Sequence, residues 1–211
     1  MSSLVEKRIY TIGHSTRALE ELVALLREHD IRRLADIRRY PGSRRYPHFS
    51  RDALEVSLPE RGIEYVHIPE LGGRRKAEAD SPNTALRNEQ FRAYADHMAS
   101  DEFRIAVDGL LAGVRPSRPQ PPGVSPGGEG DRPGRPIGAG ETPALRTAVM
   151  CAEAVPWRCH RNLLSDELLR RGCDVVHILG RGQAKRHEMS AIARIKGDHV
   201  VYRAEQSALP L

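Results

Sequence analysis

Short apolar runs alternate along the chain with segments whose apolar residues recur at helical spacing. The pattern predicts strands at 8–12, 31–37, 65–68, 147–151, 175–179 and 200–202, and helices at 19–26, 52–60, 88–99, 102–112 and 161–171. Strands that alternate with helices indicate an α/β fold with a mostly parallel sheet flanked by helices, a Rossmann-like open sheet. Ser15 or Thr16 is expected to cap the first helix, and Gly172 to end the last one.

One segment breaks this alternation. Residues 114–141 contain 14 prolines and glycines among 28 residues and show no hydrophobic period. Such a composition cannot bury enough apolar surface to fold by itself. We therefore expect a single domain over 1–211 that carries a disordered, Pro/Gly-rich insertion at 114–141. A two-domain division is the alternative, and only about 70 residues would form its second part.

The predicted fold indicates where a ligand would bind. In open α/β sheets, ligands bind beyond the carboxyl ends of the strands. The residues that follow the predicted strands are therefore candidates, and polar groups collect there: His14, Asp36 with Arg38 and Arg39, Glu70 with Gly72, and Cys151 with Glu153.

Charge adds a hint about partners. The formal net charge is +5, and only four of the 33 basic residues are lysines. Arginine binds phosphate and stacks on bases better than lysine, although a GC-rich genome also favours arginine codons. No apolar run reaches the ~18 residues of a membrane span, and residues 1–8 do not resemble a secretory signal. Three cysteines are too few for a disulfide framework, so we expect a reduced, cytoplasmic protein without a membrane partner.

The stretch 36–51 is the most unusual one, with five arginines, three aromatic residues and two prolines in 16 positions. Arginines contact phosphates, and aromatic rings stack on bases. We therefore expect this loop to contact DNA through Arg38, Arg39, Tyr40, Ser43, Arg44, Arg45, Tyr46 and Phe49. The alternatives are an ordinary solvated basic loop and, for Asp36, a structural ion pair with a neighbouring arginine.

The turn 11–16 joins the first strand to the first helix through a single glycine. It is able to bind an anion at the helix N-terminus, but it lacks the glycine pattern of a nucleotide-binding loop. His14 in this turn is a candidate acid or base, or a hydrogen-bonded structural histidine.

The segment 151–161 carries cysteines that allow three interpretations. A zinc site of Cys151, Cys159 and His160 is disfavoured, because adjacent Cys and His residues do not easily reach one ion. A phosphatase- or rhodanese-type Cys151 nucleophile is disfavoured by the spacing to Arg158. We favour the third interpretation, in which Glu153, His160 and Arg161 are site groups and the cysteines pack. We accordingly expect no metal and no cofactor.

The chain resembles the family catalogued as domain of unknown function 488. The matching motifs lie between residues 8 and 179, outside the insertion, and comprise 10–15, 36–38 with Pro41, Ser43 and Arg44, 49–50, 65–73, 150–153, 159–161 and 177–178. Some members of that family look like DNA glycosylases that remove modified pyrimidines such as 5-hydroxymethyluracil. The resemblance thus implies a DNA partner and hydrolysis of an N-glycosidic bond.

That chemistry predicts roles for the candidates. A carboxylate stabilises the oxocarbenium-like sugar and activates water, with Asp36 as the first choice and Glu153 as the second. His14, His160 and Arg161 are expected to stabilise the leaving base. Lys76 is the only lysine near a motif, so a monofunctional enzyme without lyase activity is expected. The alternatives are a non-catalytic nucleic-acid-binding module and a Cys151-dependent phosphatase or sulfurtransferase. The oligomeric state is not predicted.

Overall fold

A six-stranded sheet lies at the centre of the computed structural model, which describes residues 7–42, 45–76, 78–113 and 145–203. Its strand order is β3-β2-β4-β1-β5-β6. The first five are parallel: β1 (Lys7–Gly13), β2 (Arg33–Asp36), β3 (Glu64–His67), β4 (Thr147–Cys151) and β5 (Cys173–Gly180). β6 (Gln183–Arg186) is antiparallel to β5. The predicted α/β fold is confirmed.

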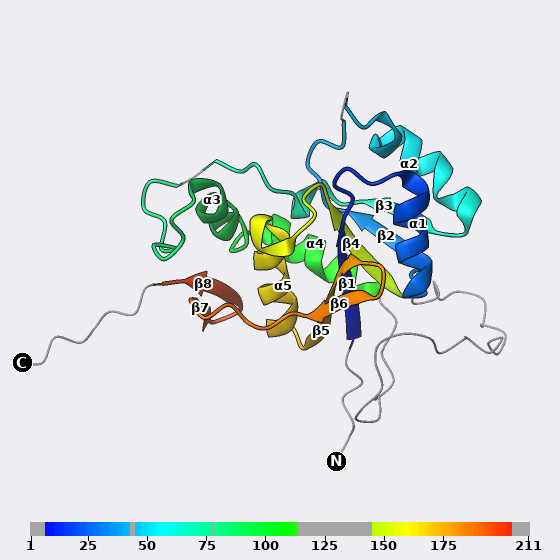
Figure 1. Cartoon of the computed structure of the whole chain (residues 1–211). Coiled ribbons are helices and arrows are strands. Elements are labelled where there is room, and N and C mark those ends of the chain that lie inside the picture. Colours follow the sequence, from blue (N-terminus) through cyan, green and yellow to red (C-terminus); the bar gives the residue numbers. More distant parts are fainter. Residues whose placement is uncertain (1–6, 43–44, 77, 114–144, 204–211) are drawn as a thin grey trace, which may run out of the picture.

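Helices cover both faces of the sheet (Figure 1). One face carries α1 (Leu19–Glu28) and α2 (Arg51–Ser57), and the other carries α3 (Glu89–His97), α4 (Asp101–Ala112) and α5 (Arg161–Arg170). A hydrophobic core lies on each face of the sheet. Successive strand residues point to opposite faces, so each apolar strand contributes side chains to both cores. Val149 joins the α3–α5 core and Met150 joins the α1–α2 core, which explains why β4 is apolar throughout.

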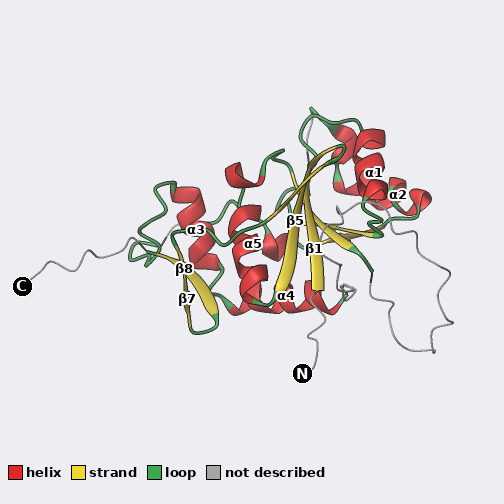
Figure 2. Cartoon of the chain, turned by 60° about the horizontal axis from the view of Figure 1, so that its bottom comes forward, coloured by secondary structure: helices red, strands yellow, loops and turns green. Residues whose placement is uncertain are grey.

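The C-terminal strands differ from the prediction. β8 (His199–Tyr202) does not enter the main sheet but pairs with β7 (Ala193–Lys196) in a separate antiparallel hairpin, apart from the sheet in Figure 2. The sixth strand of the main sheet is β6, whose residues are polar and mostly exposed. Edge strands are expected to carry such residues. An apolar-run criterion therefore misses β6.

The two predicted helix ends have different outcomes. Gly172 follows α5 with φ 75° and donates its N–H to Leu169, as predicted for a left-handed C-terminal residue. The prediction for Ser15 or Thr16 is wrong, because Ala18 occupies the N-cap of α1 and no side chain caps it. Ser15 instead adopts φ 50° and donates its N–H to the carbonyl of Ala152. This bond ties the β1 turn to the loop after β4.

The predicted insertion at 114–141 lies outside the described residues. The residues that flank it are in contact, because the Leu145 N–H donates to the Gly113 carbonyl at 3.0 Å. No helix among the described residues is long and apolar enough to cross a bilayer.

Candidate functional site

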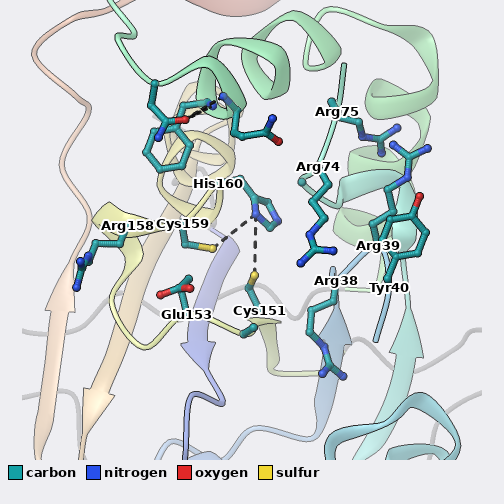
Figure 3. A pocket seen from close by; sticks show the side chains of 15 residues that line it. Arg38, Arg39, Tyr40, Arg74, Arg75, Cys151, Glu153, Arg158, Cys159 and His160 are labelled. Carbon is teal, nitrogen blue, oxygen red and sulfur yellow. Dashed lines mark hydrogen bonds between the residues drawn. The ribbon is translucent and has the colours of Figure 1, made fainter. Parts of the chain in front are cut away.

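A pocket of about 780 Å³ lies beyond the carboxyl end of β4, and segments that follow β2 and β3 also line it. β4 lies between β1 and β2, and its register places Cys151 beside Gly13 and Met150 beside Asp36. The lining residues are Arg38, Arg39, Tyr40, Gly73, Arg74, Arg75, Asn88, Gln90, Phe91, Cys151, Ala152, Glu153, Arg158, Cys159 and His160 (Figure 3). Of the predicted strand-end candidates, four line this pocket and four do not: Arg38, Arg39, Cys151 and Glu153 line it, whereas His14, Asp36, Glu70 and Gly72 do not.

Five arginines give the pocket its cationic character. Arg38 and Arg39 follow β2, Arg74 and Arg75 follow the short helical turn after β3, and Arg158 precedes α5. Guanidinium groups are always charged and are able to donate to phosphate or carboxylate oxygens. Two of the five already donate to the protein itself, Arg38 to Asp36 and Arg75 to the carbonyls of residues 69, 70 and 72. An anionic ligand therefore suits this pocket.

Two glycines let the loops of the site approach one another closely. A Cβ at Gly13 would lie 1.8 Å from the Glu153 carbonyl oxygen, and one at Gly73 would lie 2.9 Å from His160 Nδ1. Gly72, a predicted site residue, packs against the backbone of Arg39, and a Cβ at this position would lie 2.8 Å from the Arg39 nitrogen. These glycines are needed for space, since none of the three has a positive φ.

Asp36 is completely buried and fully engaged. Arg38 donates to both carboxylate oxygens, from Nε at 2.9 Å and from Nη2 at 2.6 Å, and its backbone N–H also donates at 3.0 Å. The Tyr65 hydroxyl donates at 2.8 Å, and burial beside Asp36 raises the pKa of that phenol. This geometry matches the ion-pair interpretation of Asp36. The carboxylate does not line the pocket, and the catalytic interpretation gains no support from the geometry.

His14 holds Arg38 from the other side. Its Nε2 lies 3.2 Å from Arg38 Nη1 and its Nδ1 lies 3.0 Å from the Ser15 carbonyl, so the neutral ring accepts from the first and donates to the second. Burial and the Arg38 charge lower the pKa of His14 to about 4. The ring stacks on Phe49 at 4.3 Å. His14 and Phe49 are buried, so they position Arg38 and do not offer a proton or a stacking surface to a ligand.

Glu153 is the acid that reaches the pocket. It is exposed, and it is the only carboxylate among the described residues that line the pocket. Its backbone carbonyl accepts from Arg161 Nη2 at 2.5 Å. Arg161 is buried, and it also donates to Ala154 and Thr11. The expected contact of Arg161 with a ligand is therefore replaced by a structural role, in which it fixes the loop that carries Glu153.

Two thiols and an imidazole converge beside Glu153. His160 Nδ1 lies 3.6 Å from Cys159 Sγ and 3.9 Å from Cys151 Sγ, and all three ligand atoms lie within 4.8 Å of one another. The hydrogen bond with Cys151, and to a smaller extent the hydrogen bond with His160, holds the pKa of the Cys159 thiol well below its usual value. The objection that adjacent Cys and His side chains do not converge is wrong here.

The model of the family described as domain of unknown function DUF488 matches residues 18–117. The match covers 100 of the 211 residues, and over this part the chain is similar to that family. No curated protein and no solved structure gives a match. The matched residues supply one wall of the pocket, from Arg38 to Phe91, and the segment 151–160 supplies the other.

The remaining predicted contacts divide between the rim and other surfaces. Arg39 lies over the ring of Tyr40, which is 65% exposed, and both line the pocket. Arg45 lies over Tyr46 in the same way, but neither lines the pocket. Ser43 and Arg44 lie outside the described residues. The Glu70 carbonyl accepts from Arg75 and His97, and Glu70 does not line the pocket.

Several lining residues are absent from the predicted site. Arg74 and Arg75 directly follow the strand-end segment 69–73, so extending that segment by two positions would have found them. Asn88, Gln90 and Phe91 belong to the start of α3, far from any predicted strand end. Only the tertiary fold brings α3 to the pocket.

Proposed function

We propose that this protein is a monofunctional hydrolase that cleaves the N-glycosidic bond of a modified pyrimidine, of the 5-hydroxymethyluracil type, in DNA. One observation carries the proposal: the exposed acidic residue Glu153 lines a pocket to which five arginines also contribute. A module that only binds a polyanion gains nothing from a carboxylate at this position, because it repels phosphate.

The pocket suits a nucleotide turned out of a duplex. Its volume of about 780 Å³ lies within the range of small-molecule sites. The arginines supply phosphate contacts, and the basic pI of about 9.4 favours a polyanionic partner. Tyr40 at the rim and Phe91 in the lining offer aromatic surfaces for an extruded base.

The proposed reaction uses Glu153 as the general base. Its carboxylate stabilises the positive charge that develops on the sugar and takes a proton from the attacking water. The water oxygen forms a bond to C1′ while the bond from C1′ to the base nitrogen breaks. The electron pair leaves with the base, whose negative charge is stabilised by guanidinium donors such as Arg74 and is then neutralised by a proton from solvent.

The lining also favours hydrolysis over a lyase reaction. A lyase needs an amine nucleophile, and the described residues that line the pocket include no lysine. Lys76 is exposed and is not among them. The proposal includes a cytoplasmic location, which the free thiols of all three cysteines support. A Cys151 nucleophile is less well supported, because the hydrogen bond with Cys159 and burial raise the pKa of Cys151 well above its usual value.

The experiment is a cleavage assay on duplex oligonucleotides that each carry one modified base. Heat and alkali convert an abasic site into a strand break. We expect breaks at 5-hydroxymethyluracil, and we expect Glu153→Gln to reduce the cleavage rate by at least about 100-fold while retaining DNA binding. Glu60→Gln is the matched control, since Glu60 has a 67% exposed side chain outside the pocket lining.

Two outcomes contradict the proposal. Binding without breaks at any base of the panel would identify a non-catalytic nucleic-acid-binding module. Equal cleavage by the wild type and Glu153→Gln would remove Glu153 from the reaction.

A further inference from the structure

We infer that Cys151, Cys159 and His160 form a zinc site whose fourth coordination position faces the pocket. The inference stands apart from the glycosidase proposal, because it rests on the geometry of three side chains and is tested by metal binding. All three residues line the pocket, as Figure 3 shows for the sulfurs and the imidazole.

The distances between the ligand atoms fit a tetrahedral zinc ion. Zn–S bonds near 2.3 Å and Zn–N bonds near 2.0 Å at tetrahedral angles place S and N about 3.5 Å apart. The two S···N separations here are 3.6 and 3.9 Å. Two thiols and one imidazole favour zinc over magnesium or calcium, which prefer oxygen ligands.

The backbone explains why neighbouring residues converge. Cys159 is extended, with φ −135° and ψ 149°, whereas His160 is helical, with φ −56° and ψ −16°. In a continuous strand the two side chains would point to opposite sides. The change of conformation at the start of α5 turns both toward Cys151 at the end of β4.

The surroundings hold these groups in place before any metal binds. The His160 ring lies 4.8 Å from the Tyr94 ring, and Gly73 packs against its Nδ1 side. The Arg161 N–H donates to Cys159 Sγ at 3.5 Å. Hydrogen bonds of this kind orient metal-bound groups and tune them.

The charge of the site is compatible with the five arginines. A zinc ion bound by two thiolates and a neutral imidazole has no net charge, so it adds no repulsion to the cationic wall. Three protein ligands leave one position for water or an anionic group of the ligand, which is the pattern of catalytic zinc sites. The Glu153 carboxylate lies on the same side of the pocket as the two sulfurs (Figure 3).

The test is metal binding by the full-length chain. Protein that has been stripped with chelator and reduced is titrated with zinc, and in parallel with cobalt(II) as a spectroscopic probe. We expect about one zinc per chain, a thiolate-to-cobalt charge-transfer band, and the intense visible bands of tetrahedral cobalt. Cys151→Ser and Cys159→Ser are each expected to weaken zinc binding by at least about 100-fold, whereas His160→Gln is expected to weaken it less.

Cys173→Ser is the matched control, because Cys173 is the third buried free cysteine and lies at the start of β5, outside the site. It should bind zinc as the wild type does. The wild-type spectra provide a readout that does not depend on how the variants fold.

Absence of a thiolate–cobalt band, or reaction of Cys151 and Cys159 with a thiol reagent at the same rate with and without zinc, overturns the inference. A chain that binds zinc but cleaves no DNA leaves this inference intact and removes only the glycosidase proposal.

Discussion

Two buried carboxylates show how the same group serves different ends in this molecule. Asp36 and Asp166 are both completely inaccessible to solvent. Asp36 accepts from a guanidinium and a phenol, and its main partner, Arg38, lines the pocket. Asp166 on α5 accepts from His187, Tyr202 and Ser190, which come from the C-terminal segments. The first network fixes Arg38 in the pocket lining, and the second attaches the C-terminal hairpin to the domain.

The difference lies in the charge of the partners. Removing Asp36 leaves a buried guanidinium without its counter-ion, whereas removing Asp166 leaves neutral or titratable donors unpaired. An uncompensated buried charge is more destabilising than an unpaired neutral donor. The two networks are therefore expected to differ both in stability and in their effect on the pocket.

The largest expected effect is that of Asp36→Ala. We expect it to lower the free energy of unfolding by about 3–5 kcal/mol, because Arg38 remains buried without an acceptor. Chemical denaturation monitored by circular dichroism measures this. The double variant Asp36→Ala/Arg38→Met is the control, and it should recover part of the loss. A loss below about 1 kcal/mol, the range of exposed ion pairs, would show that the pair is not buried in solution.

Asp166→Ala is expected to lower the free energy of unfolding by about 3 kcal/mol, since several buried donors lose their acceptor. The loss of stability should be largest in the C-terminal segments that Asp166 holds, which include the β7–β8 hairpin. Hydrogen exchange should increase in β7 and β8 and remain nearly unchanged at β2. Uniform acceleration across the sheet would contradict the attachment role, because it would show that the hairpin unfolds only with the whole domain.

Each network also contains a histidine that responds to acid. His14 Nε2 lies 3.2 Å from Arg38 Nη1, and His177 Nε2 lies 3.0 Å from Nδ1 of His187, the histidine that contacts Asp166. Burial lowers the pKa of His14 to about 4 and that of His177 to about 3 from 6.5, so the unfolded chain binds these protons more tightly than the folded one. Stability should fall as pH decreases below 6.5, down to about 4 for His14 and about 3 for His177, and by at most about 3 kcal/mol for His14. The free energy of unfolding, obtained from denaturation curves at each pH in this range, should depend less steeply on pH in His14→Gln. An unchanged slope in that variant would place the acid response elsewhere.

Sequence reasoning found the first network better than the second. Asp36 is the last residue of β2, and Arg38 and His14 come shortly after β2 and β1, so a rule about strand ends identifies all three. Asp166 lies in the middle of a helix, where an acidic residue ordinarily indicates the solvated face. Its burial depends on β8 packing against α5, which is a long-range contact without a local signal.

The same distinction holds for the chemistry of the pocket. The strands that carry the pocket were predicted because their apolar runs are local. Which of the two acidic residues lines the pocket could not be predicted, because Asp36 and Glu153 both lie at strand ends and only side-chain packing distinguishes them. The convergence of Cys159 with His160 depends on one backbone change at the start of α5, which residue spacing does not encode.

The smallest expected effects come from a matched pair of phenols. Tyr65 donates to Asp36 at 2.8 Å and Tyr202 donates to Asp166 at 2.9 Å, so Tyr65→Phe and Tyr202→Phe each remove one hydroxyl from a buried carboxylate. Each should lower the free energy of unfolding by about 1–2 kcal/mol. Their effects on the pocket should differ. Tyr65→Phe frees one face of the carboxylate that orients Arg38, so it should weaken the binding of an anionic oligonucleotide, whereas Tyr202→Phe should leave that binding unchanged. Fluorescence anisotropy with a labelled duplex measures both. Equal losses of binding would mean that stability alone governs the pocket, and that the two networks do not have separate tasks.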